Sequence, residues 1–98
     1  MQRIEMQFEW DDEKAALNLK KHDVSFNEAT TVWNDSLYIE LIDHKHTLDE
    51  KRFYMIGKSE QNRLIVISFT ERENKVRIIS ARLLTPRERR EYEHGSYE

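Results

Sequence analysis

The sequence of 98 residues has no cysteine, one proline, two glycines and no long apolar run. The lack of cysteine excludes disulfide bonds, thiolate catalysis and zinc sites with cysteine ligands. The first ten residues include Arg3, Glu5 and Glu9, which fits neither a signal peptide nor a membrane span. The sequence shows no glycine-rich phosphate loop and no serine–histidine–aspartate arrangement. We therefore expect a cytoplasmic protein that uses no cofactor and binds no membrane.

The composition is typical of a globular protein, with 38% hydrophobic, 10% aromatic and 36% charged residues. This length supports a single domain over residues 1–98. The net charge is −3, but the charges are unevenly distributed. Residues 1–62 contain 8 Lys/Arg and 13 Asp/Glu, whereas residues 63–92 contain 8 Lys/Arg and 4 Asp/Glu. The basic segment is either a solvated charged surface or a phosphate-binding surface within an acidic protein.

Two helices are expected early in the chain. Asp11 or Asp12 caps the first, which extends to about His22. Ser25 and Glu28 have the spacing of a capping box and begin the second. The apolar positions of the second helix recur with a helical period, at Phe26, Ala29, Val32 and Trp33. This order resembles a DNA-reading helix–turn–helix, but the polar positions of the second helix carry no Arg or Lys, which disfavours a DNA-binding regulator.

The rest of the chain predicts strands and one last helix. Apolar and alternating patterns predict strands over residues 6–10, 37–43, 50–58, 64–70 and 75–84. Residues 73–75 form the clearest hairpin turn. Residues 85–88 form a second capping box with proline at the first helical position, and this helix extends to about Glu93 before Gly95. The order β-α-α-β-β-β-β-α predicts an α+β fold in which helices pack on an antiparallel sheet.

An ordered series of residues extends along most of the chain. It consists of Phe8-Glu9-Trp10-Asp11, Lys14, Asn18, Lys21-His22, Val24, Phe26, Ala29, Glu50, Arg52, Gly57, Thr70-Glu71-Arg72, Arg77-Ile78-Ile79-Ser80-Ala81-Arg82, Glu88-Arg89 and Tyr92. In this order and spacing the series resembles the BrnT-type toxin family. The resemblance implies a RelE-like ribonuclease toxin fold and metal-independent cleavage of RNA that arrests growth. It also implies a cognate antitoxin that blocks the toxin, a higher-order toxin–antitoxin assembly, and contact with operator DNA only through the antitoxin.

Cleavage of RNA without a metal needs a base for the 2′-hydroxyl, donors for the charged transition state and an acid for the leaving oxygen. Arginine suits the second role because its planar guanidinium binds phosphate bidentately and stays charged. Arg82 is the first catalytic candidate; alternatively it forms an ion pair with Glu88 or Glu91. Glu88 is a candidate base, although the capping box also explains it. His22 is a candidate acid or base because histidine changes its charge near neutral pH.

Five further cations are candidates for binding RNA or phosphate: Lys21, Arg52, Arg72, Arg77 and Arg89. Arg52 and Arg72 lie at predicted strand ends, where side chains can reach a groove; alternatively Glu50 pairs with Arg52. Lys21 and His22 end the first helix, where cations also compensate the negative end of the helix dipole. Each of these residues therefore has a structural explanation beside the functional one.

The predicted strand over residues 75–84 carries two of the candidate arginines. Regular alternation places Arg82 on one sheet face together with Ser80, and Arg77 on the opposite face unless a bulge intervenes. On regular alternation we therefore do not expect Arg77 and Arg82 to bind the same phosphate.

The remaining candidates have simpler explanations. Trp10 and Trp33 are expected in the core, and Tyr92 is expected to pack the last helix rather than stack on a base. Tyr97 is a second candidate for base stacking. Residues 43–46 contain two histidines, but their spacing and the lack of a third ligand predict no metal site.

An alternative function is a non-catalytic toxin-like module that binds RNA or acts through its antitoxin. The acidic net charge and the lack of a unique catalytic residue favour this alternative. Residues 37–42 form an apolar strip on a predicted edge strand, which a protein partner can cover.

Overall fold

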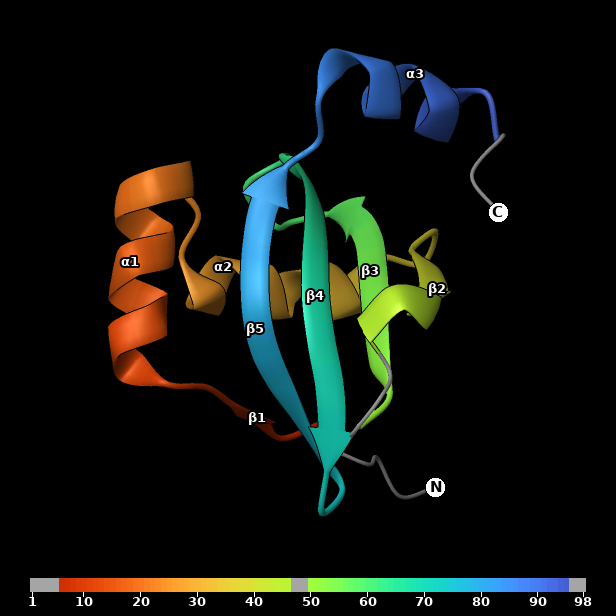
Figure 1. Ribbon diagram of the computed structural model, residues 1–98. Helices are drawn as coiled ribbons and strands as arrows, with labels where there is room; N and C mark the ends of the chain where they lie inside the picture. The colour runs from red at the N-terminus through yellow and green to blue at the C-terminus, as the bar shows by residue number, and fades with distance from the viewer. Residues whose placement is uncertain (1–5, 47–49, 96–98) are drawn as a thin grey trace, which may run out of the picture.

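The computed structural model describes residues 6–46 and 50–95 (Figure 1). Five strands form one sheet in the order β1-β5-β4-β3-β2. Their bounds are Phe8–Glu9 for β1, Ile39–Asp43 for β2, Arg52–Lys58 for β3, Leu64–Arg72 for β4 and Lys75–Leu83 for β5. Strands β2 to β5 are antiparallel neighbours in chain order, whereas β1 pairs with β5 in parallel. The α+β class and the order of elements are confirmed, but the sheet is mixed because β1 lies beside the last strand.

The helices begin and end at the predicted signals. The first helix, α1 (Asp12–His22), is capped by Asp11, whose carboxylate accepts hydrogen bonds from the backbone N–H groups of Glu13 and Lys14 at 2.9 and 3.1 Å. The last helix, α3 (Pro86–Glu93), begins with a complete capping box. Within residues 6–46 and 50–95, no helix is long and apolar enough to cross a membrane.

The second helix differs from its prediction. Helix α2 (Phe26–Thr30) has five residues and continues as a 3₁₀ turn, η1 (Thr31–Asn34). Ser25 caps it, but the Glu28 carboxylate does not complete the box, because it instead binds Arg63 and the Ser59 hydroxyl. Since α2 buries three of its five residues, it is not a DNA recognition helix.

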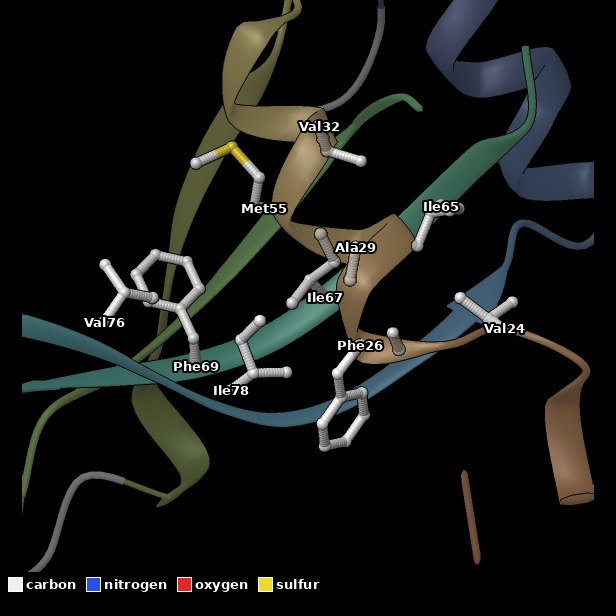
Figure 2. Packing of buried hydrophobic residues seen from close by; sticks show 11 residues of the cluster. Val24, Phe26, Ala29, Val32, Met55, Ile65, Ile67, Phe69, Val76 and Ile78 are labelled. Atoms are coloured by element: carbon white, nitrogen blue, oxygen red, sulfur yellow. The ribbon is translucent and has the colours of Figure 1, made fainter. Parts of the chain in front are cut away.

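The hydrophobic core lies between α2–η1 and one face of the sheet (Figure 2). The predicted apolar positions Phe26, Ala29 and Val32 are all buried there. Trp33 is partly buried and packs edge-on against Phe8 and Phe69, with ring centroids 5.0 and 5.1 Å apart. These contacts connect β1, η1 and β4, and the sheet face toward α2–η1 is the face that packs into the core.

A β-bulge interrupts β5. Ser68 of β4 pairs with Ser80, but the next residue, Phe69, pairs with Ile78, so the register skips Ile79. Burial follows the same shift, because Val76 and Ile78 are buried before the bulge and Ala81 is buried after it. Regular alternation therefore does not hold along β5, and the expectation that Arg77 and Arg82 lie on opposite faces is wrong. The bulge exchanges the faces halfway along the strand, and Arg77, Ser80 and Arg82 share the face opposite α2.

Helix α1 lies beside β5 (Figure 1), and the side chain of Asn18 attaches it to that strand. The side-chain nitrogen of Asn18 donates to the carbonyl oxygens of Ala81 and Val24 at 2.8 and 3.0 Å. Its side-chain oxygen accepts from the Ala81 N–H at 3.1 Å. The amide thus makes the two hydrogen bonds that a neighbouring strand would make to Ala81.

Candidate functional site

The sheet face opposite α2 collects charged and hydroxyl side chains from three strands. Strand pairing places Arg52 and Arg77 on either side of Thr70, and Tyr54 and Ser80 on either side of Ser68. Arg82 follows on the same face, opposite Val66. We call this surface the arginine face; it is formed by Arg52, Tyr54, Ser68, Arg77, Ser80 and Arg82 around the buried Thr70, whose hydroxyl donates to the Lys51 carbonyl at 2.6 Å. It brings together three of the arginines predicted from the sequence.

Three arginines cluster at one end of the arginine face. Arg72 donates two hydrogen bonds of 2.9 Å to the carboxylate of Glu50. Hydrogen bonding to Arg72 is the main reason why the pKa of Glu50 is lowered, and the charges of Arg52 and Arg77 lower this pKa further. Arg77 also donates to Glu9 at 3.1 Å. Glu50 therefore pairs with Arg72. The Glu50–Arg52 pair, which the sequence analysis gave as an alternative, is wrong.

Arg82 lies toward the other end of the arginine face and forms a two-pronged ion pair with Glu88. Its terminal nitrogens Nη1 and Nη2 donate to the two carboxylate oxygens at 2.7 and 3.0 Å. Glu88 also accepts from the Thr85 N–H at 2.9 Å as part of the capping box. The bond from Arg82 lowers the pKa of Glu88 to about 2, and the bonds from Thr85 act in the same direction. Glu88 is thus held ionised, is a weak base at neutral pH, and fixes the orientation of Arg82.

Tyr54 lies between the two ends and was not among the predicted site residues. Burial raises the pKa of its hydroxyl, and a hydrogen bond with the buried Asp43 carboxylate raises it further. The charges of Arg82 and Arg52 act in the opposite direction, which places Tyr54 within the field of both arginines. A usable signal exists in the sequence, because Arg52 and Tyr54 are two residues apart on one strand and must share a face.

The other predicted residues lie elsewhere. Lys21 and His22 line a cleft between α1 and β5. Arg89 is exposed on α3 and lines a small groove near the β3–β4 turn. Tyr92 donates to the Leu37 carbonyl at 3.4 Å, a packing contact between α3 and the residues before β2. Tyr97 lies outside the described residues.

The sequence predicts no metal site. Within the part of the chain that the structure describes, no group of three or more His, Asp or Glu side chains is arranged to hold a metal ion.

Comparison with known families identifies the chain. The model of a family described as the ribonuclease toxin BrnT of type II toxin–antitoxin systems matches residues 10–88. The chain belongs to this family. Membership implies a protein antitoxin as its partner, since the systems are of type II. The matched residues include the whole arginine face, α1 and the Arg82–Glu88 pair.

A solved structure supports the fold. The chain is similar to the crystal structure of the Brucella abortus ribonuclease toxin BrnT, with a TM-score of 0.61 and 20% sequence identity. The similarity covers 83% of this chain and 99% of the Brucella chain. The comparison with curated proteins gave no match. At this identity the likeness concerns the fold, and the RelE-like relationship stays a prediction from the sequence.

Proposed function

We propose that this chain is a cytoplasmic, single-domain endoribonuclease that cleaves RNA without a metal and thereby arrests growth until its antitoxin binds it. The observation that supports this proposal is the arginine face. Three arginines, one tyrosine and three smaller hydroxyl side chains lie together on one side of the sheet. Arginine donors suit a reaction in which negative charge develops on phosphate oxygens.

In the proposed reaction the 2′-oxygen attacks the adjacent phosphorus, and the bond from phosphorus to the 5′-oxygen breaks. The 2′-hydroxyl proton passes to a base, and the leaving 5′-oxygen takes a proton from an acid. The products are a 2′,3′-cyclic phosphate and a free 5′-hydroxyl. This sequence of steps needs no metal and no redox partner, in agreement with the groups on the arginine face.

We assign Arg82 to the phosphate that reacts, because Glu88 holds its guanidinium in a fixed orientation. Glu88 is assigned as a positioning residue rather than as the base, because its pKa of about 2 makes it a poor proton acceptor at neutral pH. Tyr54 is the candidate acid for the leaving oxygen, because its hydroxyl carries a proton at neutral pH and its side chain lies between Arg52 and Arg82 on the arginine face. His22 is the candidate base, since its cleft meets the arginine face at Ser80.

Arg52, Arg72 and Arg77 are assigned to neighbouring phosphates. They lie around Glu50 at the end of the arginine face away from the Arg82–Glu88 pair. Lys21 and Arg89 are outside this group, and we assign them contacts with RNA farther from the cleaved bond.

The test is induced expression of the chain in bacteria, with growth and total RNA followed together. We expect growth arrest and loss of RNA with the wild-type chain, and relief of both with Arg82→Ala. Loss of a fixed donor to the transition state costs roughly 10²–10³-fold in kcat. Arg87→Ala is the matched control, because Arg87 is exposed on α3 and pairs across the helix with Glu91.

Purified protein completes the test. Cleavage by the wild-type chain is expected to persist in a metal chelator, and Arg82→Ala is expected to keep its binding to the antitoxin, which shows that it remains folded. Normal growth with intact RNA, despite soluble wild-type protein, would instead establish the non-catalytic binding module.

A further inference from the structure

A second cationic surface lies beside the arginine face. It is an open cleft of about 730 Å³ between α1 and the bulged part of β5. One side is a stripe of α1 side chains at helical spacing, Lys14, Leu17 and Lys21. The other side is formed by Ile79 and Ser80 of β5. The cleft therefore lies where the bulge interrupts the regular pairing of β5 with β4.

Every charged side chain of the described residues that lines this cleft is cationic. They are Lys14, Lys20 and Lys21, and the ring of His22 adds a fourth basic group. None of the three lysines forms an ion pair with any residue that the structure describes. A chain with a net charge of −3 thus concentrates unpaired positive charge in one concave place.

The helix dipole explains only part of this charge. Lys20, Lys21 and His22 lie in the last turn of α1, where cations stabilise a helix. Lys14 is the third residue of α1 and lies in the first turn, where a cation faces the positive end of the dipole. A lysine at this position lowers the stability of the helix, but it places a second cation on the same side of α1 as Lys21. Lys14 therefore points to a ligand of negative charge.

Each side of the cleft also carries an apolar side chain. Leu17 is 66% exposed although it lies between two lysines of the stripe, and Ile79 is partly buried. Apolar side chains flanked by cations suit a chain that alternates charged phosphates with flat, weakly polar bases. Lys14 and Lys21 are seven residues apart, or about 10 Å along the helix axis, a length that spans roughly three stacked nucleotides.

Ser80 connects the cleft to the arginine face. It lines the cleft, and it is also paired with Ser68 on the arginine face, two residues before Arg82. A strand of RNA that is bound at Arg82 can therefore continue over Ser80 into the cleft without crossing the core. Leu17 and Ile79 can pack against the face of a base only where that base is unstacked, which a double helix does not offer, so the occupant is single-stranded.

We propose that the cleft between α1 and β5 binds the single-stranded RNA that flanks the cleaved bond, with Lys14 and Lys21 on its phosphates and Leu17 and Ile79 against a base. The proposal rests on the proposed function, because it extends the path of the same substrate. It adds a requirement for substrate length and for single strands. It also assigns Lys14, which the sequence did not mark as a site residue.

The first experiment measures binding apart from cleavage. The probe is a fluorescent 12-nucleotide RNA that is 2′-O-methylated throughout and so cannot be cleaved, and its affinity is measured by anisotropy at several salt concentrations. The test variant is Lys14→Gln with Lys21→Gln, since glutamine preserves helix propensity. The matched control is Arg87→Gln with Arg90→Gln, which removes two positive charges from exposed positions on α3 that do not line the cleft.

We expect the test variant to bind the 12-nucleotide RNA roughly tenfold more weakly and to reduce the slope of log affinity against log salt by about 1.4, the value for two phosphates of a single strand. The control variant is expected to match the wild type in both. Equal binding by the test and control variants would overturn the proposal, as would the absence of measurable binding by the wild type.

The second experiment compares a 12-nucleotide RNA with a dinucleotide as substrates for cleavage. We expect the test variant to lower kcat/KM for the long RNA by a larger factor than kcat/KM for the dinucleotide, because the dinucleotide is too short to reach from Arg82 into the cleft. A chain that binds the long probe through Lys14 and Lys21 but cleaves nothing would support the cleft and refute the proposed function. If the test variant and the control variant cleave the long RNA equally well, the proposed function is supported and the role of the cleft is refuted. Loss of antitoxin binding without loss of RNA binding would assign the cleft to the protein partner and overturn the proposal.

Discussion

The Glu88 carboxylate takes part in two interactions, the N-terminal cap of α3 and the ion pair with Arg82. One carboxylate oxygen accepts from both the Thr85 N–H and Arg82, while the other accepts from Arg82 alone. A rotation of the Glu88 side chain would therefore break the helix cap and release the guanidinium together. The orientation of the main phosphate-binding candidate is thus coupled to the stability of the last helix.

Glu88→Gln tests this coupling through pH. The pKa of Glu88 is about 2 in the folded chain against 4.5 for the ordinary group, so its charge stabilises the fold above pH 4.5 and this stabilisation is lost as pH falls toward 2. Glutamine can keep the capping bond but has no charge. We expect Glu88→Gln to lower the free energy of unfolding by about 1–2 kcal/mol at pH 7, a value reduced for the partial exposure of the pair, and to match the wild type near pH 2.

Urea unfolding at a series of pH values measures this difference. Glu93→Gln removes an exposed acid from the same helix and serves as the control. If Glu88→Gln lowered the free energy of unfolding by the same amount at every pH, the charge of Glu88 would make no contribution to stability.

At the scale of elements, the order of helices and strands could be predicted because each element has its own local signal. Capping residues mark the three helices, and apolar alternation marks the strands. The bulge in β5 could not be predicted, since Ile78-Ile79-Ser80 contains no glycine and reads as an ordinary strand. Its cause lies in the pairing with β4 and in the fit of Ala81 to the core, which are contacts between distant parts of the chain.

The candidate site was predictable only in its parts. Arg52, Arg77 and Arg82 could be selected as single residues, because arginine suits phosphate. Their assembly depends on the bulge, and without it Arg77 would point toward the core side of the sheet. Tyr54 was missed because an aromatic residue in a strand usually indicates packing, and only its neighbours across the sheet indicate another use.

The turn between β4 and β5 gives a prediction at the same scale. Glu73 and Asn74 form a two-residue loop with φ of 51° and 68°, the pattern of a type I′ turn. Glutamate is poorly suited to positive φ, whereas Asn followed by Gly is the preferred pair. We expect Glu73→Asn with Asn74→Gly to raise the free energy of unfolding by about 1 kcal/mol in thermal or urea unfolding. A lower stability would show that the Glu73 side chain or the native turn makes contacts that the substitution removes.

At the scale of the whole molecule, the placement of charge matters more than its sum. The chain is acidic, yet four arginines lie on or beside the arginine face, Arg52, Arg72, Arg77 and Arg82, and three lysines line the adjoining cleft. Acidic residues such as Glu9 and Glu50 lie at the margin of this region and hold individual arginines. The lysines of the cleft, which pair with no acidic residue that the structure describes, therefore supply the unpaired positive charge, whereas Glu9, Glu50 and Glu88 partly neutralise the arginine face.

Two double variants with the same net charge separate these effects. Arg52→Gln with Arg77→Gln removes two charges from the arginine face, and Arg87→Gln with Arg90→Gln removes two from exposed positions on α3. We expect the first pair to weaken binding of a non-cleavable RNA roughly tenfold or more at moderate salt, and the second to change it less than twofold. If both double variants lost the same affinity for RNA, binding would depend on the net charge of the protein and not on the arginine face.

The Asn18 amide has a consequence for self-association. A strand at the border of a sheet can template pairing with another molecule, and hydrophobic strands are prone to aggregate in this way. At the β5 border, β1 covers the stretch around Val76 and Arg77, and the single amide of Asn18 covers Ala81. One side chain thus replaces a strand and leaves Ala81 with no hydrogen-bonding groups to offer a second molecule. Growth of the sheet by addition of a strand is directed to β2, at the opposite border.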